Sequence, residues 1–146
     1  MPSVAHRRRA PLSWADRLLL AEALLTLAVA SLAIRLLPFR RIVAAAGSTD
    51  LATVPAESAG ETARKVVWAV RAWARRVPWK AVCFQQGLAV HVMLRRRGIA
   101  SYLHYGVSQS DGLKAHVWVS AVGRDVIGGD EAAAFTRLAT YPSLPA

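Results

Sequence analysis

Cysteine is nearly absent from this sequence: Cys83 is the only one among 146 residues. A single thiol cannot form an intramolecular disulfide, and it cannot build a metal site that needs several thiolates. The roles left to Cys83 are packing, an intermolecular bond or thiol chemistry. A lone cysteine also fits a reducing compartment, so we expect a cytoplasmic protein. We expect neither a metal site nor a cofactor.

Acidic residues are also scarce, with nine Asp and Glu against nineteen Lys and Arg, which gives a formal net charge of +10. Such a balance favours anionic partners, whether nucleic acids, acidic lipid headgroups or acidic peptides. The basic residues, however, form short scattered clusters, such as residues 7–9 and 95–97, and not one stripe. The chain also lacks the interleaved aromatic and basic residues of single-strand binders and the spacing of zinc fingers. We therefore expect no nucleic-acid partner.

Apolar residues are abundant, at 54% of the chain, and they are densest in segment 13–37. Ser13 followed by Asp16 predicts a helix start, and Pro38 predicts its end. A membrane-spanning helix needs about 20 mostly apolar residues, and Glu22 would cost a few kcal/mol inside a bilayer unless it is paired. We therefore favour a helix buried on protein, with membrane contact or a targeting segment as alternatives.

The length fits one compact domain with an appendage. Residues 44–60 are mainly Ala, Ser, Thr, Gly and Pro, which is typical of a linker. This composition divides the chain into a basic tail with an apolar helix (1–43), a linker (44–60) and a core (61–146).

The core begins with helical periodicity and continues with alternation. Apolar residues recur at helical spacing over 61–77 and 83–97, and Pro78 and Gly98 end these two helices. Alternating residues then predict three strands, at 99–107, 113–122 and 125–127, and a last helix from Asp130 to Ala139. Helices followed by an antiparallel sheet indicate an α+β fold.

Cys83 falls in the first turn of the second core helix. Unpaired N–H groups and the helix dipole favour a thiolate at this position. His116 lies on the second strand, on one face with Trp118 and Ser120. An imidazole within reach of a thiolate would complete a nucleophile and its base. The alternatives stay open, because a cysteine is often a small buried residue and a strand histidine is often structural.

A third group would orient the imidazole. Asp130, just after the third strand, and Asp125, at its start, are the candidates, and we favour Asp130. Asp130 would otherwise only cap the last helix. Two further histidines, His91 and His104, are weaker candidates for the base.

Other residues near Cys83 would complete the site. The backbone N–H of Cys83 would stabilise an oxyanion, helped by Gln85 or Gln86. Two tryptophans, Trp79 and Trp118, flank the predicted site and would shape a groove.

One combination of residues resembles a known family. The matching residues are Trp79, Cys83, Leu88-Ala89, and the segments 94–99, 105–107 and 115–119. Together they resemble the transglutaminase-like cysteine peptidases of lasso peptide biosynthesis, the leader peptidases often called B proteins. The similarity runs from Thr62 to the C-terminus, and segment 36–41 also looks like that family's N-terminal part.

The resemblance implies a papain-like fold in which Cys83 attacks the bond between a leader and its core peptide, with His116 as base. Because only a short tail precedes Pro11, the chain resembles the split, peptidase-only form. The implied partners are a precursor peptide, a small separate leader-recognition protein and an ATP-dependent lasso cyclase. Val117 replaces the family's usual small residue, and the third catalytic position is poorly fixed there, so the choice between the two aspartates stays open.

Two hypotheses follow from the resemblance. The basic residues would hold an acidic leader or partner, which accounts for a charge that the family pattern does not explain. The alternative to a peptidase is a catalytically inactive scaffold of the same fold, which binds a peptide or associates with a membrane.

Overall fold

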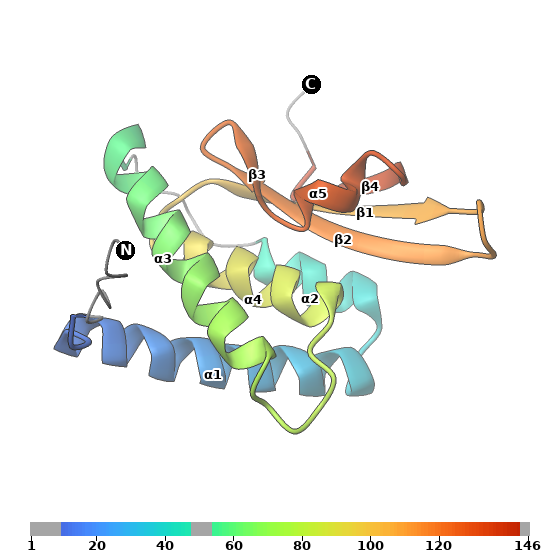
Figure 1. Ribbon diagram of the computed structural model, residues 1–146. Helices are drawn as coiled ribbons and strands as arrows, with labels where there is room; N and C mark the ends of the chain where they lie inside the picture. The colour runs from blue at the N-terminus through green and yellow to red at the C-terminus, as the bar shows by residue number, and fades with distance from the viewer. Residues whose placement is uncertain (1–9, 48–53, 144–146) are drawn as a thin grey trace, which may run out of the picture.

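The computed structural model describes residues 10–47 and 54–143, and it is an α+β protein with helices on one face of a sheet (Figure 1). In chain order the elements are α1 (Trp14–Leu36), α2 (Phe39–Ala46), α3 (Ala56–Ala74), α4 (Cys83–Arg95), β1 (Ser101–Ser108), β2 (Lys114–Ala121), β3 (Arg124–Ile127), α5 (Gly129–Ala132) and β4 (Thr136–Tyr141). The predicted fold class, including the apolar N-terminal helix, is confirmed. The basic tail lies outside the described residues.

Helix α1 begins at the predicted cap. The Ser13 hydroxyl accepts the Asp16 N–H at 3.1 Å, and the Asp16 carboxylate accepts the Ser13 N–H at 3.1 Å. One side of α1, with Ala23, Leu27 and Ala30, is buried. Because this side packs on α3 and α4, α1 belongs to the protein core.

The acid within α1 has a partner. Arg97, just after α4, donates from both terminal nitrogens to the Glu22 carboxylate, with Nη1–Oε1 at 3.0 Å. This hydrogen bond lowers the pKa of Glu22 below its ordinary value, against the opposing effect of burial. A paired carboxylate explains how an apolar helix tolerates an acid, and it ties α1 to the end of α4.

The segment predicted as a linker contains regular structure at both ends. Helix α2 extends to Ala46, and α3 already begins at Ala56. Buried residues from α1, α2, α3, α4 and the sheet form one continuous hydrophobic core. The division of the chain at 44–60 stays a prediction, and residues 48–53 lie outside the described part.

The sheet is antiparallel, with strand order β3-β2-β1-β4. The first three strands lie where alternation predicts them, but the last helix is wrong. A single turn, α5, is followed by β4, which pairs with β1. The alanines at 132–134 suggested a longer helix, whereas the free edge of β1 offers backbone hydrogen bonds to a segment with β-branched Thr136 and Thr140.

Helix α4 lies very close to β2. A Cβ atom added at Gly87 would lie 2.7 Å from the Val117 Cγ1 atom, which is too short for a real contact. Both residues are buried. Gly87 therefore allows α4 to approach the sheet at the strand that carries His116.

We predict opposite effects for two glycine substitutions in helices. Gly87→Ala should lower the free energy of unfolding by about 1–2 kcal/mol, because overpacking of about 1–3 kcal/mol exceeds the gain in helix propensity. Gly60→Ala in α3, where nothing lies within 4 Å of the added Cβ, should raise it by up to about 1 kcal/mol. Urea denaturation measures both, and equal changes in the two variants would contradict the close approach at Gly87.

Candidate active site

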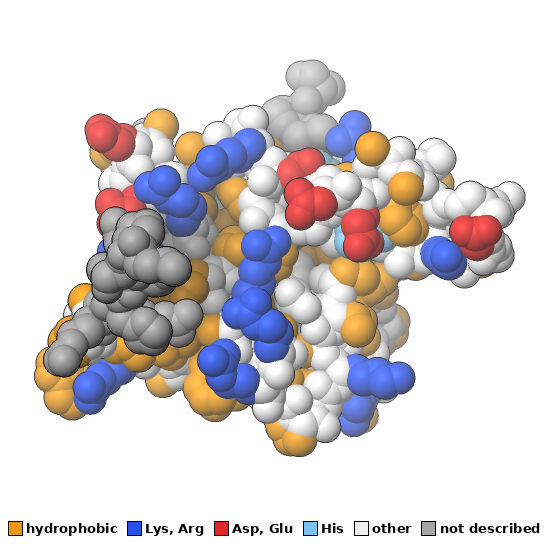
Figure 2. Space-filling view, in the orientation of Figure 1, with side chains coloured by type: hydrophobic (Ala, Val, Ile, Leu, Met, Phe, Trp, Pro, Cys, Tyr) orange, Lys and Arg blue, Asp and Glu red, His pale blue; other side chains and the backbone are white. Residues whose placement is uncertain are grey.

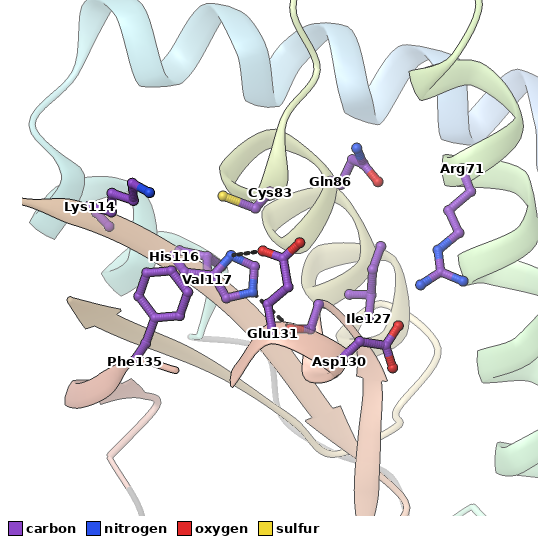
Figure 3. Close-up of a pocket in the computed structure, with 12 residues that line it drawn as sticks. Arg71, Cys83, Gln86, Lys114, His116, Val117, Ile127, Asp130, Glu131 and Phe135 are labelled. Atoms are coloured by element: carbon purple, nitrogen blue, oxygen red, sulfur yellow. Dashed lines mark hydrogen bonds and ion pairs between the residues drawn. The ribbon is translucent and has the colours of Figure 1, made fainter. Parts of the chain in front are cut away.

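Cys83 is the first residue of α4, as predicted. Its side chain is partly exposed and lines a cavity of about 640 Å³ between α4, β2 and α5 (Figure 3). The Gln85 side chain accepts the Val82 N–H at 3.1 Å, which caps the start of the helix. The backbone N–H of Cys83 belongs to the first turn, whose donors have no partner within the helix.

His116 lines the same cavity, from β2. Its ring packs against two aromatic side chains: the Trp118 ring is stacked at 6.0 Å between centroids, and the Phe135 ring lies at 4.9 Å. Only 6% of His116 is exposed. This packing holds the imidazole in one plane at the wall of the cavity.

A hydrogen bond to the backbone fixes the tautomer of His116. The Nε2 atom lies 2.8 Å from the carbonyl oxygen of Gly128, and a carbonyl can only accept. Nε2 therefore carries the proton in the neutral ring, and the lone pair is on Nδ1. The Glu131 Oε2 atom lies 4.0 Å from Nδ1, so this carboxylate would pair with the ring once Nδ1 takes up a proton. Glu131 is 74% exposed, and such a pair contributes about 1 kcal/mol or less.

The position of this carbonyl depends on glycine. Gly128 has a φ of +75°, in the left-handed region, and a Cβ there would lie 2.8 Å from the Val117 carbonyl oxygen. Only glycine fits both conditions without strain. The backbone at Gly128 can thus pass close to β2, and its carbonyl oxygen lies within hydrogen-bond distance of His116 Nε2.

The cavity opens where β2 has a free edge. Strand β3 pairs with β2 only from Val119 to Ala121, so among the described residues segment 114–118 has no strand beside it on that side. In an alternating strand Val117 faces α4 whereas His116 faces the other way. Because the sheet ends here, residues from both of its faces line one cavity, and Cys83 and His116 are both among them.

The predicted carboxylates differ in position. Asp130 lines the cavity, is exposed, and lies in the first turn of α5 after the N-cap Gly128, so it is not itself the cap. Asp125 lines a neighbouring hollow on the side of α3. Within the described residues neither aspartate forms a hydrogen bond or ion pair with His116. The role of a third catalytic carboxylate stays a prediction.

The other predicted residues are divided between the site and the core. Gln86 lines the cavity, and its amide donates to the Ala81 carbonyl at 2.7 Å, whereas Gln85 is used at the helix start. Trp79 does not line the cavity: its indole donates to Ser31 of α1 at 3.0 Å. Trp118 is buried against His116.

Sequence reasoning missed several residues of the site. Glu131 and Phe135 contact the imidazole, and Arg71 and Lys114 line the cavity with opposite charge to the acids of α5. Figure 3 shows Lys114 and Arg71 on either side of the two acids, Asp130 and Glu131. The Gly128 carbonyl was missed because a backbone group leaves no mark in the sequence. Arg71 was missed because it lies on α3, far from the other site residues in the sequence.

A comparison with protein families identifies the fold's relatives. The model of the transglutaminase-like superfamily matches residues 23–140. The chain belongs to this superfamily. The transglutaminase-like superfamily includes cysteine proteases, and the match extends from α1 to β4. No curated protein and no solved structure matches the chain significantly.

Two other histidines of this transglutaminase-like core have structural positions. His104 bonds to Ser120 and Thr140 through its two ring nitrogens. His91 is 1% exposed, and its Nδ1 atom lies 2.9 Å from the Ser101 hydroxyl, while its Nε2 atom has no hydrogen-bond partner among the described residues. Burial, with smaller effects of Arg95 and His104, lowers the pKa of His91 from 6.5 to about 4.

We predict that His91 makes the protein less stable in mild acid. Because the folded pKa of about 4 lies below the ordinary 6.5, the unfolded chain takes up the proton first as the pH falls. The stabilisation from the neutral ring is full above pH 6.5 and is lost toward pH 4, which amounts to about 2 kcal/mol between pH 7.5 and pH 5. Denaturant titrations should show this loss in the wild type and a loss smaller by about that amount in His91→Gln. Equal pH dependence in both proteins would refute it.

Proposed function

We propose that this protein is a cysteine endopeptidase that removes the leader peptide from a ribosomally made lasso peptide precursor. The main support is that Cys83, at a helix start, and His116, with its Nδ1 lone pair free, line one cavity in a member of a superfamily that includes cysteine proteases. The residues that resemble lasso leader peptidases supply the substrate class. The proposed partners are a small leader-recognition protein and an ATP-dependent cyclase, in the cytoplasm.

The first chemical step is attack on the bond between leader and core. The Cys83 sulfur bonds to the carbonyl carbon of the last leader residue, while Nδ1 of His116 takes the thiol proton. The carbonyl oxygen becomes an oxyanion, which the Cys83 N–H and the Gln86 amide would stabilise. Gly128 holds the Nε2–H, so the ring presents the nitrogen that accepts the proton.

The second step releases the core peptide and then the leader. The tetrahedral intermediate collapses as Nδ1–H donates its proton to the departing amine of the core peptide, which leaves a thioester between Cys83 and the leader. A water molecule, deprotonated by Nδ1, attacks the thioester. Its hydrolysis gives a free leader carboxylate and restores the thiol. Cationic Arg71 and Lys114 at the cavity suit an acidic leader segment.

We predict that Cys83→Ala abolishes leader removal in a mixture of precursor and recognition protein. The rate should fall at least about a thousandfold, because the nucleophile is lost, while binding of the precursor is retained. Mass spectrometry of the products measures the rate, and His104→Gln, a histidine outside the cavity, is the control. Cleavage that survives Cys83→Ala would end the assignment, and a wild-type protein that binds but never cleaves would support an inactive scaffold.

The same assay tests the third catalytic position. We keep Asp130 as the preferred carboxylate and Asp125 as the alternative, but the Gly128 carbonyl already orients His116. Asp130→Asn should therefore slow cleavage only about tenfold, and Asp125→Asn should leave it almost unchanged, whereas loss of a sole orienting carboxylate costs about 10⁴. A loss of a thousandfold or more in either variant would assign the orienting role to that aspartate in the substrate complex.

A further inference from the structure

Helix α1 has a second apolar side that no described residue covers. Its residues recur every three to seven positions along one side of the helix, and between 57% and 77% of each is exposed. We call these residues the outer strip: Trp14, Leu18, Leu25, Val29, Leu32 and Leu36. Scattered exposed leucines are normal, but a continuous apolar side over a helix of 23 residues indicates a binding surface.

The outer strip is framed by arginines. Arg17 and Arg35 are exposed and lie about five turns apart, hence on the same flank of α1. Along one side of α1, a groove of about 290 Å³ that includes Val29 is apolar except at Thr26 and two arginines, Arg41 and Arg96. Along the other, the hollow between α1 and α3 contains two more arginines, Arg75 and Arg76. In Figure 2, blue side chains border the orange surface along the lower edge, where α1 runs.

The acids of α1 are already engaged. Asp16 accepts the hydrogen bonds of Ser13 at the helix start, and Glu22 binds Arg97. A second copy packed on the outer strip would therefore offer no available α1 carboxylate to the flanking arginines. Charge complementarity favours an anionic partner over a second copy of this chain.

Helix α1 could span a bilayer by length and composition alone, but its contacts oppose this. Ala23 and Leu27 are fully buried against the other helices, and the Trp73 indole donates to the Leu20 carbonyl at 2.8 Å. A transmembrane position would remove α1 from these contacts. One side of α1 is packed on protein, and the other side is apolar and exposed. Such a helix can bind an apolar surface with its axis parallel to that surface.

The end of the strip has the chemistry of a membrane interface. Trp14 is the most exposed residue of the strip, at 77%, and the Arg17 guanidinium lies 5.2 Å from the centre of its ring. Tryptophan is enriched at the headgroup level of bilayers, and arginines nearby bind anionic lipids. In Figure 1, α1 lies on the far side of α4 from the sheet, so a surface that contacts the strip leaves the site between α4 and β2 open.

From these observations we propose that the outer strip docks α1 in the plane of an anionic lipid bilayer, with the framing arginines at the phosphate groups. The apolar side chains enter the boundary between headgroups and acyl chains, which is how amphipathic helices bind membrane surfaces. The proposal does not depend on peptidase activity.

The test is centrifugation of the full chain with vesicles of phosphatidylcholine alone or of equal parts phosphatidylcholine and phosphatidylglycerol. The wild type should pellet with the anionic vesicles and bind neutral ones at least about tenfold more weakly, and high salt should release it. The variant Leu25→Gln/Leu32→Gln should lose at least about tenfold in affinity, as should Arg17→Gln/Arg35→Gln. The matched control, Leu113→Gln/Leu138→Gln, changes two exposed leucines outside α1, one just before β2 and one in β4, and should bind like the wild type.

Three results would overturn the proposal. The wild type could stay in the supernatant with anionic vesicles, or the control variant could lose as much binding as the strip variant. Light scattering could instead show a wild-type dimer that the strip variant dissociates, which would assign the strip to a second copy. Circular dichroism of every variant establishes that it is folded, and Cys83→Ala should bind vesicles like the wild type, which separates this proposal from the peptidase assignment.

Discussion

The close approach of α4 to β2 at Gly87 determines the geometry of the candidate site. Gly87 lies one turn after Cys83 on the same side of α4, and Val117, which it contacts, directly follows His116. A contact made possible by a missing side chain therefore sets the distance between the thiol and the strand with the imidazole. The second close approach, of Gly128 to Val117, brings a carbonyl to the same histidine. Both sides of the site thus depend on backbone that packs tightly against one valine.

Local sequence signals predicted the start of α1 and the elements that carry Cys83 and His116. The Ser13 cap, the start of α4 at Cys83 and the alternation around His116 all act within a few residues, so they can be recognised without the fold. Strand β4 could not be predicted, because its alanine-rich approach favours a helix and only the free edge of β1 decides otherwise. The carbonyl of Gly128 is hidden for a similar reason, since its role comes from position and every residue has a carbonyl.

The sequence of α1 also did not predict which of its sides is buried and which is exposed. Its composition fits both a core helix and a membrane helix, and the structure divides these properties between two sides. The side with Ala23 and Leu27 belongs to the core, whereas the outer strip faces away from it. Glu22 would count against a membrane in isolation, yet its bond to Arg97 removes that objection for a helix that lies on a surface. The division of α1 into a buried side and an exposed apolar side depends on which side the other helices cover, and this is known only from the fold.

If His116 activates Cys83, as we propose, the reactivity of the only thiol in the chain depends on that imidazole. Alkylation by iodoacetamide, followed by intact-protein mass, reports Cys83 alone and needs neither precursor nor partner. We expect His116→Ala to slow alkylation at neutral pH by about tenfold or more, because the imidazole no longer accepts the thiol proton, while His104→Gln reacts like the wild type. Equal alkylation rates in the wild type and His116→Ala would contradict it.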